Sequence, residues 1–254
     1  MKTHLHSIVF AILILSLANA LHAQTNAPAS AGTNAPAVAV VHTNTALVPA
    51  KHTGKRTDDV MQRTKDNPGE CDIAFIGDSI TQGWEGGGKN VWKKYYGNLK
   101  ALNFGVGGDR TEHVLWRFEH GQLDGVKPKV AVLMIGTNNS NKEDNTEADI
   151  LEGVQAIVSQ IRARLPDTKI ILVAIFPRSP TFSTQRGKIL QVNQALAKLD
   201  DGKMIYYVDF GSQMIEADGS ISKAMMRDAL HPGEPGYEIW ASAIEPKLKE
   251  LLAK

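Results

Sequence analysis

Five short apolar runs, each nearly continuous in hydrophobic residues and rich in Val and Ile, recur between residues 72 and 208 of the chain. They cover residues 72–76, 101–104, 130–135, 170–175 and 205–208. A strand without polar alternation is buried on both faces, which is typical of a parallel sheet. The runs therefore predict five parallel strands in the interior of an α/β domain.

Amphipathic segments separate the runs and predict helices over residues 91–98, 112–119, 146–165, 184–199 and 237–252. Strands that alternate with helices indicate a three-layer α/β/α sandwich. Right-handed crossovers favour a flavodoxin-like strand order of 2-1-3-4-5. In such sheets ligands bind beyond the carboxyl ends of the strands, so the residues that follow each run are the candidates for function.

Residues 1–23 have the pattern of a secretory signal peptide. Lys2 precedes an apolar run over residues 8–17, and small residues follow, with Ala20 and Ala23 as the two candidate cleavage positions. The apolar run is about half the roughly twenty residues that a spanning helix needs, which disfavours the alternative of an uncleaved anchor. We expect a secreted or periplasmic protein with no stable membrane insertion after cleavage.

Residues 24–50 differ in composition from the rest of the chain. They consist mostly of Ala, Thr, Asn, Pro and Val, and the sequence TNAPA occurs at 25–29 and again at 33–37. A segment with no helical or strand period and little to bury is predicted to be a disordered linker. The folded domain is accordingly expected over residues 51–254.

The net charge bears on possible binding partners, and the cysteine content bears on disulfide bonds. The formal net charge is +1, and loss of Lys2 with the signal peptide would leave a neutral chain, which gives no indication of a nucleic-acid partner. Cys71 is the sole cysteine, so no intramolecular disulfide can form. Neither property identifies a partner by itself.

Polar residues follow the predicted strands. Asp78 and Ser79 come after the first, a glycine loop ending in Gly108 after the second, and Asn138 after the third. Each has a simple structural explanation, because Asp and Ser cap helices, glycine turns the chain and Asn favours turns. The pair Asp228 and His231, before the last helix, could likewise be a capping or surface pair.

Together these residues supply what acyl transfer requires. A serine such as Ser79 becomes a nucleophile when a base removes its proton, and His231, oriented by Asp228, could be that base. The N–H groups of Ser79 and Gly108 and the amide of Asn138 could form the oxyanion hole.

Rival motifs are incomplete. Residues 83–90 match a phosphate-binding loop except at Asn90, where a hydroxyl is required, and Thr81 replaces the second glycine of the G-x-S-x-G elbow. His113 and His120 lie on one predicted helix away from the strand ends, and no close His/Asp cluster is expected beyond Asp228 and His231. We therefore predict no metal site.

Four blocks resemble those of the SGNH (GDSL) hydrolases: GDSI at 77–80, the glycine block at 108, GTNN at 136–139 and DALH at 228–231. Residues 102–118 are especially similar to the catalytic subunits of brain-type platelet-activating-factor acetylhydrolase, and bacterial acetylesterases are related to them. The resemblance spans roughly residues 51–252. It implies a flavodoxin-like fold and hydrolysis of carboxylic esters, frequently acetyl esters, without a cofactor.

The resemblance also implies roles for five residues: Ser79 as nucleophile and oxyanion donor, Gly108 and Asn138 as further donors, His231 as base and Asp228 as its orienting acid. The brain enzyme is intracellular, so its lipid substrate is not transferred to a chain with an export signal. Dimers occur among the relatives, which leaves a homodimer open.

The expected function is that of an exported serine esterase acting on small acyl groups, foremost acetyl, of a carbohydrate or other polar substrate. A lysophospholipase or thioesterase for longer chains and a non-catalytic glycan-binding protein are the alternatives. Trp84 and Trp116 could face a sugar or an acyl chain, although a packing role for Trp116 is equally compatible with its helical position. Asp78 is expected to support the turn without taking a proton.

Overall fold

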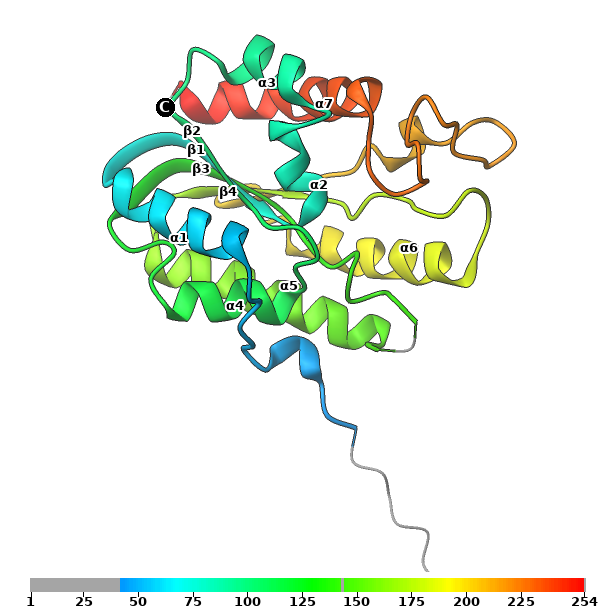
Figure 1. The fold of residues 1–254 in the computed structure, drawn as a ribbon, viewed down its shortest axis with the longest axis horizontal. Helices are drawn as coiled ribbons and strands as arrows, with labels where there is room; N and C mark the ends of the chain where they lie inside the picture. Colours follow the sequence, from blue (N-terminus) through cyan, green and yellow to red (C-terminus); the bar gives the residue numbers. More distant parts are fainter. Residues whose placement is uncertain (1–41, 143, 254) are drawn as a thin grey trace, which may run out of the picture. The chain divides into compact units, whose positions relative to one another are not determined.

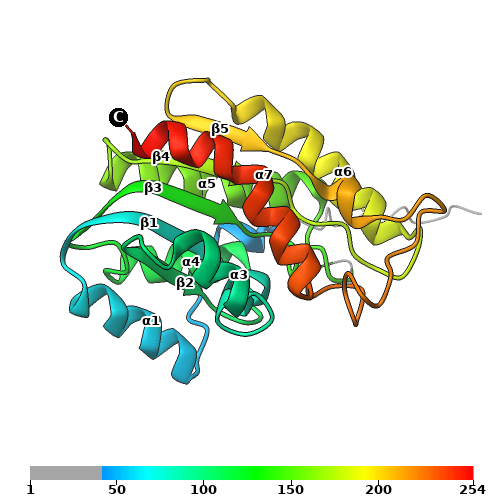
Figure 2. The same ribbon diagram turned by 90° about the horizontal axis from the view of Figure 1, so that it is seen from above.

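The structure is a computed structural model that describes residues 42–142 and 144–253. The predicted signal peptide, 1–23, and residues 24–41 of the predicted linker lie outside the described residues. A five-stranded parallel sheet has the order β2-β1-β3-β4-β5, which confirms the predicted order (Figure 2). Its strands are β1 (Gly69–Gly77), β2 (Ala101–Gly105), β3 (Val126–Met134), β4 (Lys169–Val173) and β5 (Ile205–Val208).

Helices cover both faces of the sheet, as a three-layer sandwich requires (Figure 1). One face carries α3 (Lys89–Tyr96) and α7 (Glu234–Leu252), and the other carries α4 (Thr111–Glu119), α5 (Glu147–Arg164) and α6 (Thr184–Leu196). The remaining helical segments are α1 (Lys55–Asp66), α2 (Ser79–Gln82) and the short 3-10 turns η1 (Thr45–Leu47), η2 (Gly83–Glu85), η3 (Ala197–Leu199) and η4 (Gly211–Met214).

The strands divide their side chains between two apolar cores. In β1, Phe75 packs on the side of α3 and α7, whereas Ile76 packs on the side of α4 and α5, and both are fully buried. Alternate residues of a strand point to opposite faces, so a strand covered on both faces must be apolar throughout. The sequence pattern of the five runs is explained by this double burial.

Helix α1 was not predicted from the sequence. Its buried face consists of Thr57, Val60 and Thr64, which recur at intervals of three and four residues. Two of the three are threonines, so hydrophobicity alone does not reveal the stripe.

The prediction of a linker through residue 50 is wrong for residues 42–50. Ala46 in η1 is fully buried, and its carbonyl accepts a hydrogen bond of 2.9 Å from Oγ1 of Thr111. The amide of Asn145 donates to Oγ1 of Thr45 at 2.9 Å. Hydrogen bonds from distant residues order this segment, and its own composition contains no sign of them.

Two arginines of α1 cover the open edge of the sheet at β2. Nε of Arg56 donates to the carbonyl of Gly105 at 2.8 Å, and Arg63 donates to the carbonyl of Asn103. The carboxylate of Glu85 forms ion pairs with both guanidinium groups. Unpaired edge carbonyls are thereby satisfied, which blocks pairing with another strand.

No helix in the described part of the chain has the length and hydropathy of a membrane span.

Candidate active site

Ser79 stands where β1 ends and α2 begins. The side chain that caps α2 is Asp78, whose Oδ1 accepts a hydrogen bond of 2.9 Å from the N–H of Ile80. Oγ of Ser79 instead lies 2.9 Å from Nε2 of His231, which is 152 residues further along the chain. The serine hydroxyl is therefore free of the capping role and is paired with a potential base.

Asp228 orients His231. Its Oδ2 lies 2.6 Å from Nδ1 of the ring, and because a carboxylate can only accept, Nδ1 carries the proton. Nε2 is then left with a lone pair that faces the hydroxyl of Ser79. Burial acts to raise the pKa of Asp228, but the hydrogen bonds from the ring and the backbone N–H of His231 prevail and lower it to about 2. The carboxyl is thus ionised at any pH where the ester chemistry would run.

The turn from Asp228 to His231 has an uncommon backbone conformation, because Ala229 within it has a φ of 55°. Ser179, in a separate loop, also has a positive φ, of 73°. The N–H of Ser179 donates to the carbonyl of Ala229 at 2.9 Å, so one strained turn supports the other. Non-glycine residues with positive φ concentrate at sites whose geometry is functionally constrained.

The glycine loop that contains the predicted donor Gly108 lies beside Ser79, and Asn138 is hydrogen-bonded to the end of this loop. A Cβ added to Gly107 would lie 3.8 Å from Cβ of Ser79, so the glycine loop lies beside the serine. The N–H of Gly107 donates to Oε1 of Gln82 at 2.7 Å, and the amide of Asn138 donates to the carbonyl of Asp109 at 2.8 Å. Gly108, which lies between Gly107 and Asp109 in the chain, has a φ of 81°, a conformation that favours glycine.

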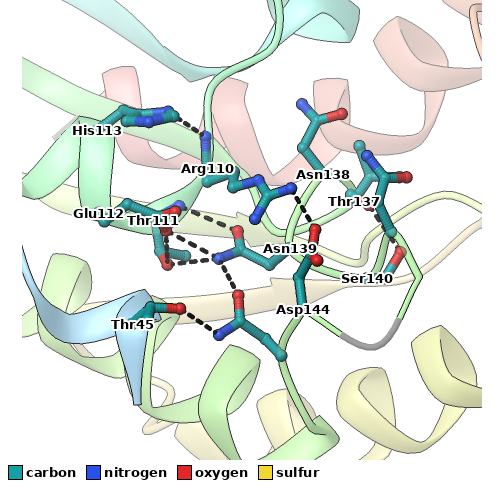
Figure 3. Close-up of polar contacts among 12 residues, drawn as sticks. Thr45, Arg110, Thr111, Glu112, His113, Thr137, Asn138, Asn139, Ser140 and Asp144 are labelled. Carbon is teal, nitrogen blue, oxygen red and sulfur yellow. Dashed lines mark hydrogen bonds and ion pairs between the residues drawn. The ribbon is translucent and has the colours of Figure 1, made fainter. Parts of the chain in front are cut away.

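Asn138 and Asn139 have different surroundings. The amide of Asn139 contacts Thr111, Glu112 and Asn145, and Asn138 shares none of these contacts (Figure 3). The amide nitrogen of Asn139 is fully engaged inside the fold, whereas the amide of Asn138 donates one hydrogen bond among the described residues and has a second hydrogen available. Of the two, Asn138 is suited to an oxyanion.

Sequence reasoning missed several supporting residues. Gln82 lies one helical turn after Ser79, and that spacing in a predicted strand-to-helix junction could have indicated it. Arg178 is half-buried, and its guanidinium donates to the carbonyl of Thr137 at 3.1 Å and to Oδ1 of Asn141 at 3.0 Å. It fixes the loop that carries Asn138, and no local signal marks it.

Asp78 has a property that its expected role in the turn did not indicate. Complete burial raises the pKa of this carboxyl to about 7, although the Ile80 N–H and the charges of His231 and Arg178 act to lower it. Its second oxygen has no hydrogen-bond partner among the described residues. At neutral pH a substantial fraction of the molecules is therefore protonated at Asp78.

The premise that no further His/Asp cluster exists is also wrong, because His52, Asp109 and His113 offer ligand atoms that lie within 4.8 Å of one another. The two ring Nδ1 atoms and the carboxylate of this cluster already take part in hydrogen bonds. The carboxylate of Asp109 accepts from His52 and from the buried Arg117, and Nδ1 of His113 accepts from the N–H of Arg110 at 3.0 Å. A guanidinium on the same carboxylate opposes a cation, so the cluster fits a metal poorly.

The two tryptophans differ from the expectation for a substrate surface. Trp84 is buried among Phe75, Tyr237 and Trp240 and cannot face a substrate. Trp116 is half-buried and stacks on His120 at a centroid distance of 3.8 Å. Trp84 therefore has a packing role, whereas the sequence analysis considered packing only for Trp116.

Comparison with known proteins decides the family. Residues 75–239 match the model of the GDSL-like lipase/acylhydrolase family. The chain belongs to this family. Its activity class is therefore that of a carboxylic ester hydrolase, as predicted from the sequence.

Individual family members are similar over most of the chain. Platelet-activating factor acetylhydrolase IB subunit alpha2 of Homo sapiens is 37% identical over 184 residues, which cover 72% of this chain and 78% of the relative. A structure from Bacteroides fragilis, assigned as an acylhydrolase, matches 79% of this chain and 100% of its own with a TM-score of 0.64 and 21% identity. An acetylxylan esterase from Geobacillus stearothermophilus matches 72% of this chain and 95% of its own, with a TM-score of 0.55 and 19% identity. The two structural likenesses show the fold.

Proposed function

We propose that this GDSL hydrolase is an exported serine esterase that removes small acyl groups, foremost acetyl, from a carbohydrate or another polar alcohol. The observation that carries the proposal is the continuous hydrogen-bonded path from Ser79 through His231 to Asp228, beside a glycine loop. Ser79 is 152 residues from His231 in sequence, and the fold brings their reactive atoms within hydrogen-bond reach, which a chance surface pair would not require.

In the proposed mechanism, Oγ of Ser79 attacks the ester carbonyl while Nε2 of His231 takes its proton. The oxyanion is held by the N–H groups of Ser79 and Gly108 and by the amide of Asn138. His231 then passes the proton to the leaving alcohol, which departs and leaves an acyl-serine. Water, activated by the same ring, attacks this acyl-serine and restores Ser79. Asp228 keeps the imidazole in the required tautomer and stabilises its protonated form.

An open site supports the preference for small acyl groups. The side chains of His231 and Asp228 are 44% and 55% exposed. A long acyl chain gains its affinity from an apolar channel, whereas an acetyl group needs little more than the oxyanion hole.

The names of two relatives support acetyl as the acyl group but indicate different alcohols. The human relative is named an acetylhydrolase of platelet-activating factor, and the Geobacillus stearothermophilus protein is named an acetylxylan esterase. The predicted signal peptide supports an extracellular, polar substrate. An acetylated lipid is the second candidate, because the relative with 37% identity carries that name.

The test compares acetate, butyrate and octanoate esters of one chromogenic alcohol, followed by acetate release from acetylated glycans and from an acetylated glycerophospholipid. We expect kcat/KM to be highest for acetate and glycans to release acetate. A maximum at octanoate would favour the lysophospholipase or thioesterase. Ser79→Ala is the control for non-enzymatic release, and glycan binding without acid release by the wild type would indicate the non-catalytic alternative.

Export has a separate test. The chain is expressed in a bacterium, and the protein recovered from the periplasm and the medium is sequenced from its N-terminus. Cleavage after Ala20 or Ala23 gives chains that begin at Leu21 or Gln24. Recovery of the intact chain from the cytoplasm alone would contradict export.

A further inference from the structure

The segment of residues 42–52 is hydrogen-bonded to helices α4 and α5. Its hydrogen bonds include Nε2 of His42 to the carboxylate of Asp149 at 2.9 Å, the amide of Asn44 to Glu152 at 2.8 Å, and the N–H of Ala50 to the carbonyl of Glu112 at 3.2 Å. Together these contacts fix the path of the chain as far as His52, which therefore reaches the glycine loop in a defined position.

The ring of His52 is fixed by two neighbours. Nδ1 lies 2.7 Å from Oδ1 of Asp109, and this carboxylate is fully buried and also bound by Arg117. The ring stacks on His113 with 4.8 Å between centroids. A carboxylate that is paired with a guanidinium is ionised, so Nδ1 of His52 must donate the hydrogen bond.

The ring also covers Gly108. A Cβ added to Gly108 would lie 3.2 Å from Cε1 of His52, which places the imidazole directly against the α-carbon of the predicted oxyanion donor. Asp109, the next residue, accepts from His52 through its side chain and from the Asn138 amide through its carbonyl. The two predicted donors, Gly108 and Asn138, are therefore both connected to His52 through one peptide segment.

We propose that His52 is a positioning residue for the oxyanion hole: its contacts with Gly108 and Asp109 hold the N–H of Gly108 and the Asn138 amide in register with Ser79. This role rests on the proposed esterase function. Removing one oxyanion donor costs about 100- to 1,000-fold in rate, and a misplacement of about 1 Å costs up to about 100-fold. Loss of the His52 contacts would displace the two donors without removing them, so we expect a loss of about 10- to 100-fold.

The experiment uses the full chain with His52→Ala, His52→Asn and the control His42→Ala. The Asn variant can place an amide N–H close to the position of Nδ1 and restore the bond to Asp109. His42→Ala removes another histidine–carboxylate pair from the same segment without touching the glycine loop. We measure kcat and KM on an acetate ester, Tm, and the rate at which diethyl p-nitrophenyl phosphate phosphorylates Ser79, a reaction that also places an anionic oxygen in the hole.

We expect His52→Ala to lower kcat and the phosphorylation rate by about 10- to 100-fold at nearly constant KM, His52→Asn to recover most of the loss, and His42→Ala to stay within about twofold of the wild type. Equal kcat for His52→Ala and His42→Ala would overturn the positioning role, and so would a loss that follows Tm alone across the three variants. A wild type that hydrolyses no ester would instead overturn the proposed function and this role with it.

Discussion

Asp228 holds His231 at two points: Oδ2 lies 2.6 Å from the ring Nδ1, and Oδ1 accepts the backbone N–H of the same residue at 2.8 Å. The first bond sets the tautomer and the second fixes the backbone from which the ring projects. Because the pair is about half exposed, its contribution to stability is small. The arrangement is therefore better explained by catalysis than by folding.

Replacing Asp228 by Asn should reduce kcat by about 10,000-fold while leaving the fold intact, because the amide can donate to Nδ1 and stabilise the wrong tautomer. Steady-state kinetics on an acetate ester measures the loss, and circular dichroism checks the fold. Asp209→Asn is the matched control. Asp209 also follows a strand, but its carboxylate accepts from the N–H of Gly211 at 2.9 Å and does not contact the triad. Similar kcat values for the two variants would contradict the orienting role.

Asp78→Asn should remove a pH dependence of stability. The pKa of this buried carboxyl is raised to about 7, above its ordinary value of 3.8, so the folded state holds a proton that the unfolded state releases. The stabilisation is complete below the unfolded pKa and is lost as pH rises towards 7. Between about pH 5 and pH 8 the wild type should lose about 2 kcal/mol more than Asp78→Asn.

Urea unfolding of both proteins at the two pH values measures that difference. The comparison cancels groups that act in the opposite direction, such as His113, whose pKa is lowered to about 4 mainly by burial. Parallel changes in the free energy of unfolding of the wild type and Asp78→Asn would show that the carboxyl is ionised throughout.

The buried ion pair of Arg117 and Asp109 predicts a non-additive pair of substitutions. Arg117→Leu leaves a fully buried carboxylate without its guanidinium, with His52 as its remaining hydrogen-bond partner among the described residues, and should cost about 3–5 kcal/mol. In the double variant Arg117→Leu, Asp109→Leu no charge is left unpaired, so its loss should be smaller than that of Arg117→Leu alone. Denaturant unfolding of the set tests this, and a double variant that loses the sum of the two single changes would argue against a coupled pair.

Local patterns were sufficient to predict most of the fold. Each of the five apolar runs became a strand because a doubly covered strand is apolar along its whole length, and this property is visible in consecutive residues. The candidate site was predictable for a related reason: the carboxyl ends of parallel strands lie at one edge, so Ser79, Gly108 and Asn138 had to be neighbours.

What the sequence did not reveal depends on long-range polar contacts. His52 and Asp109 are 57 residues apart, and Thr111 and Ala46 are 65 apart. Each pairing satisfies a buried polar group, yet neither partner has a periodic neighbour that would mark it. Residues 42–50 consequently resembled a linker, and helix α1 was hidden because threonines occupy its buried stripe.

A pair of glycine substitutions separates steric demand from chain flexibility. A Cβ on Gly105 would lie 2.2 Å from the backbone N of Gln82, where β2 passes under the helix that carries Ser79. Backbone atoms cannot move aside cheaply, so Gly105→Ala should cost about 3 kcal/mol or more and should also lower kcat by displacing α2. Gly187, within α6, has nothing within 4 Å of an added Cβ. Gly187→Ala should therefore stabilise the protein by about 0.5–1 kcal/mol and leave kcat unchanged, since alanine favours the helix. Urea unfolding and acetate-ester kinetics on both variants distinguish the two effects, and a stable, fully active Gly105→Ala would show that α2 does not approach β2 as closely as the structure indicates.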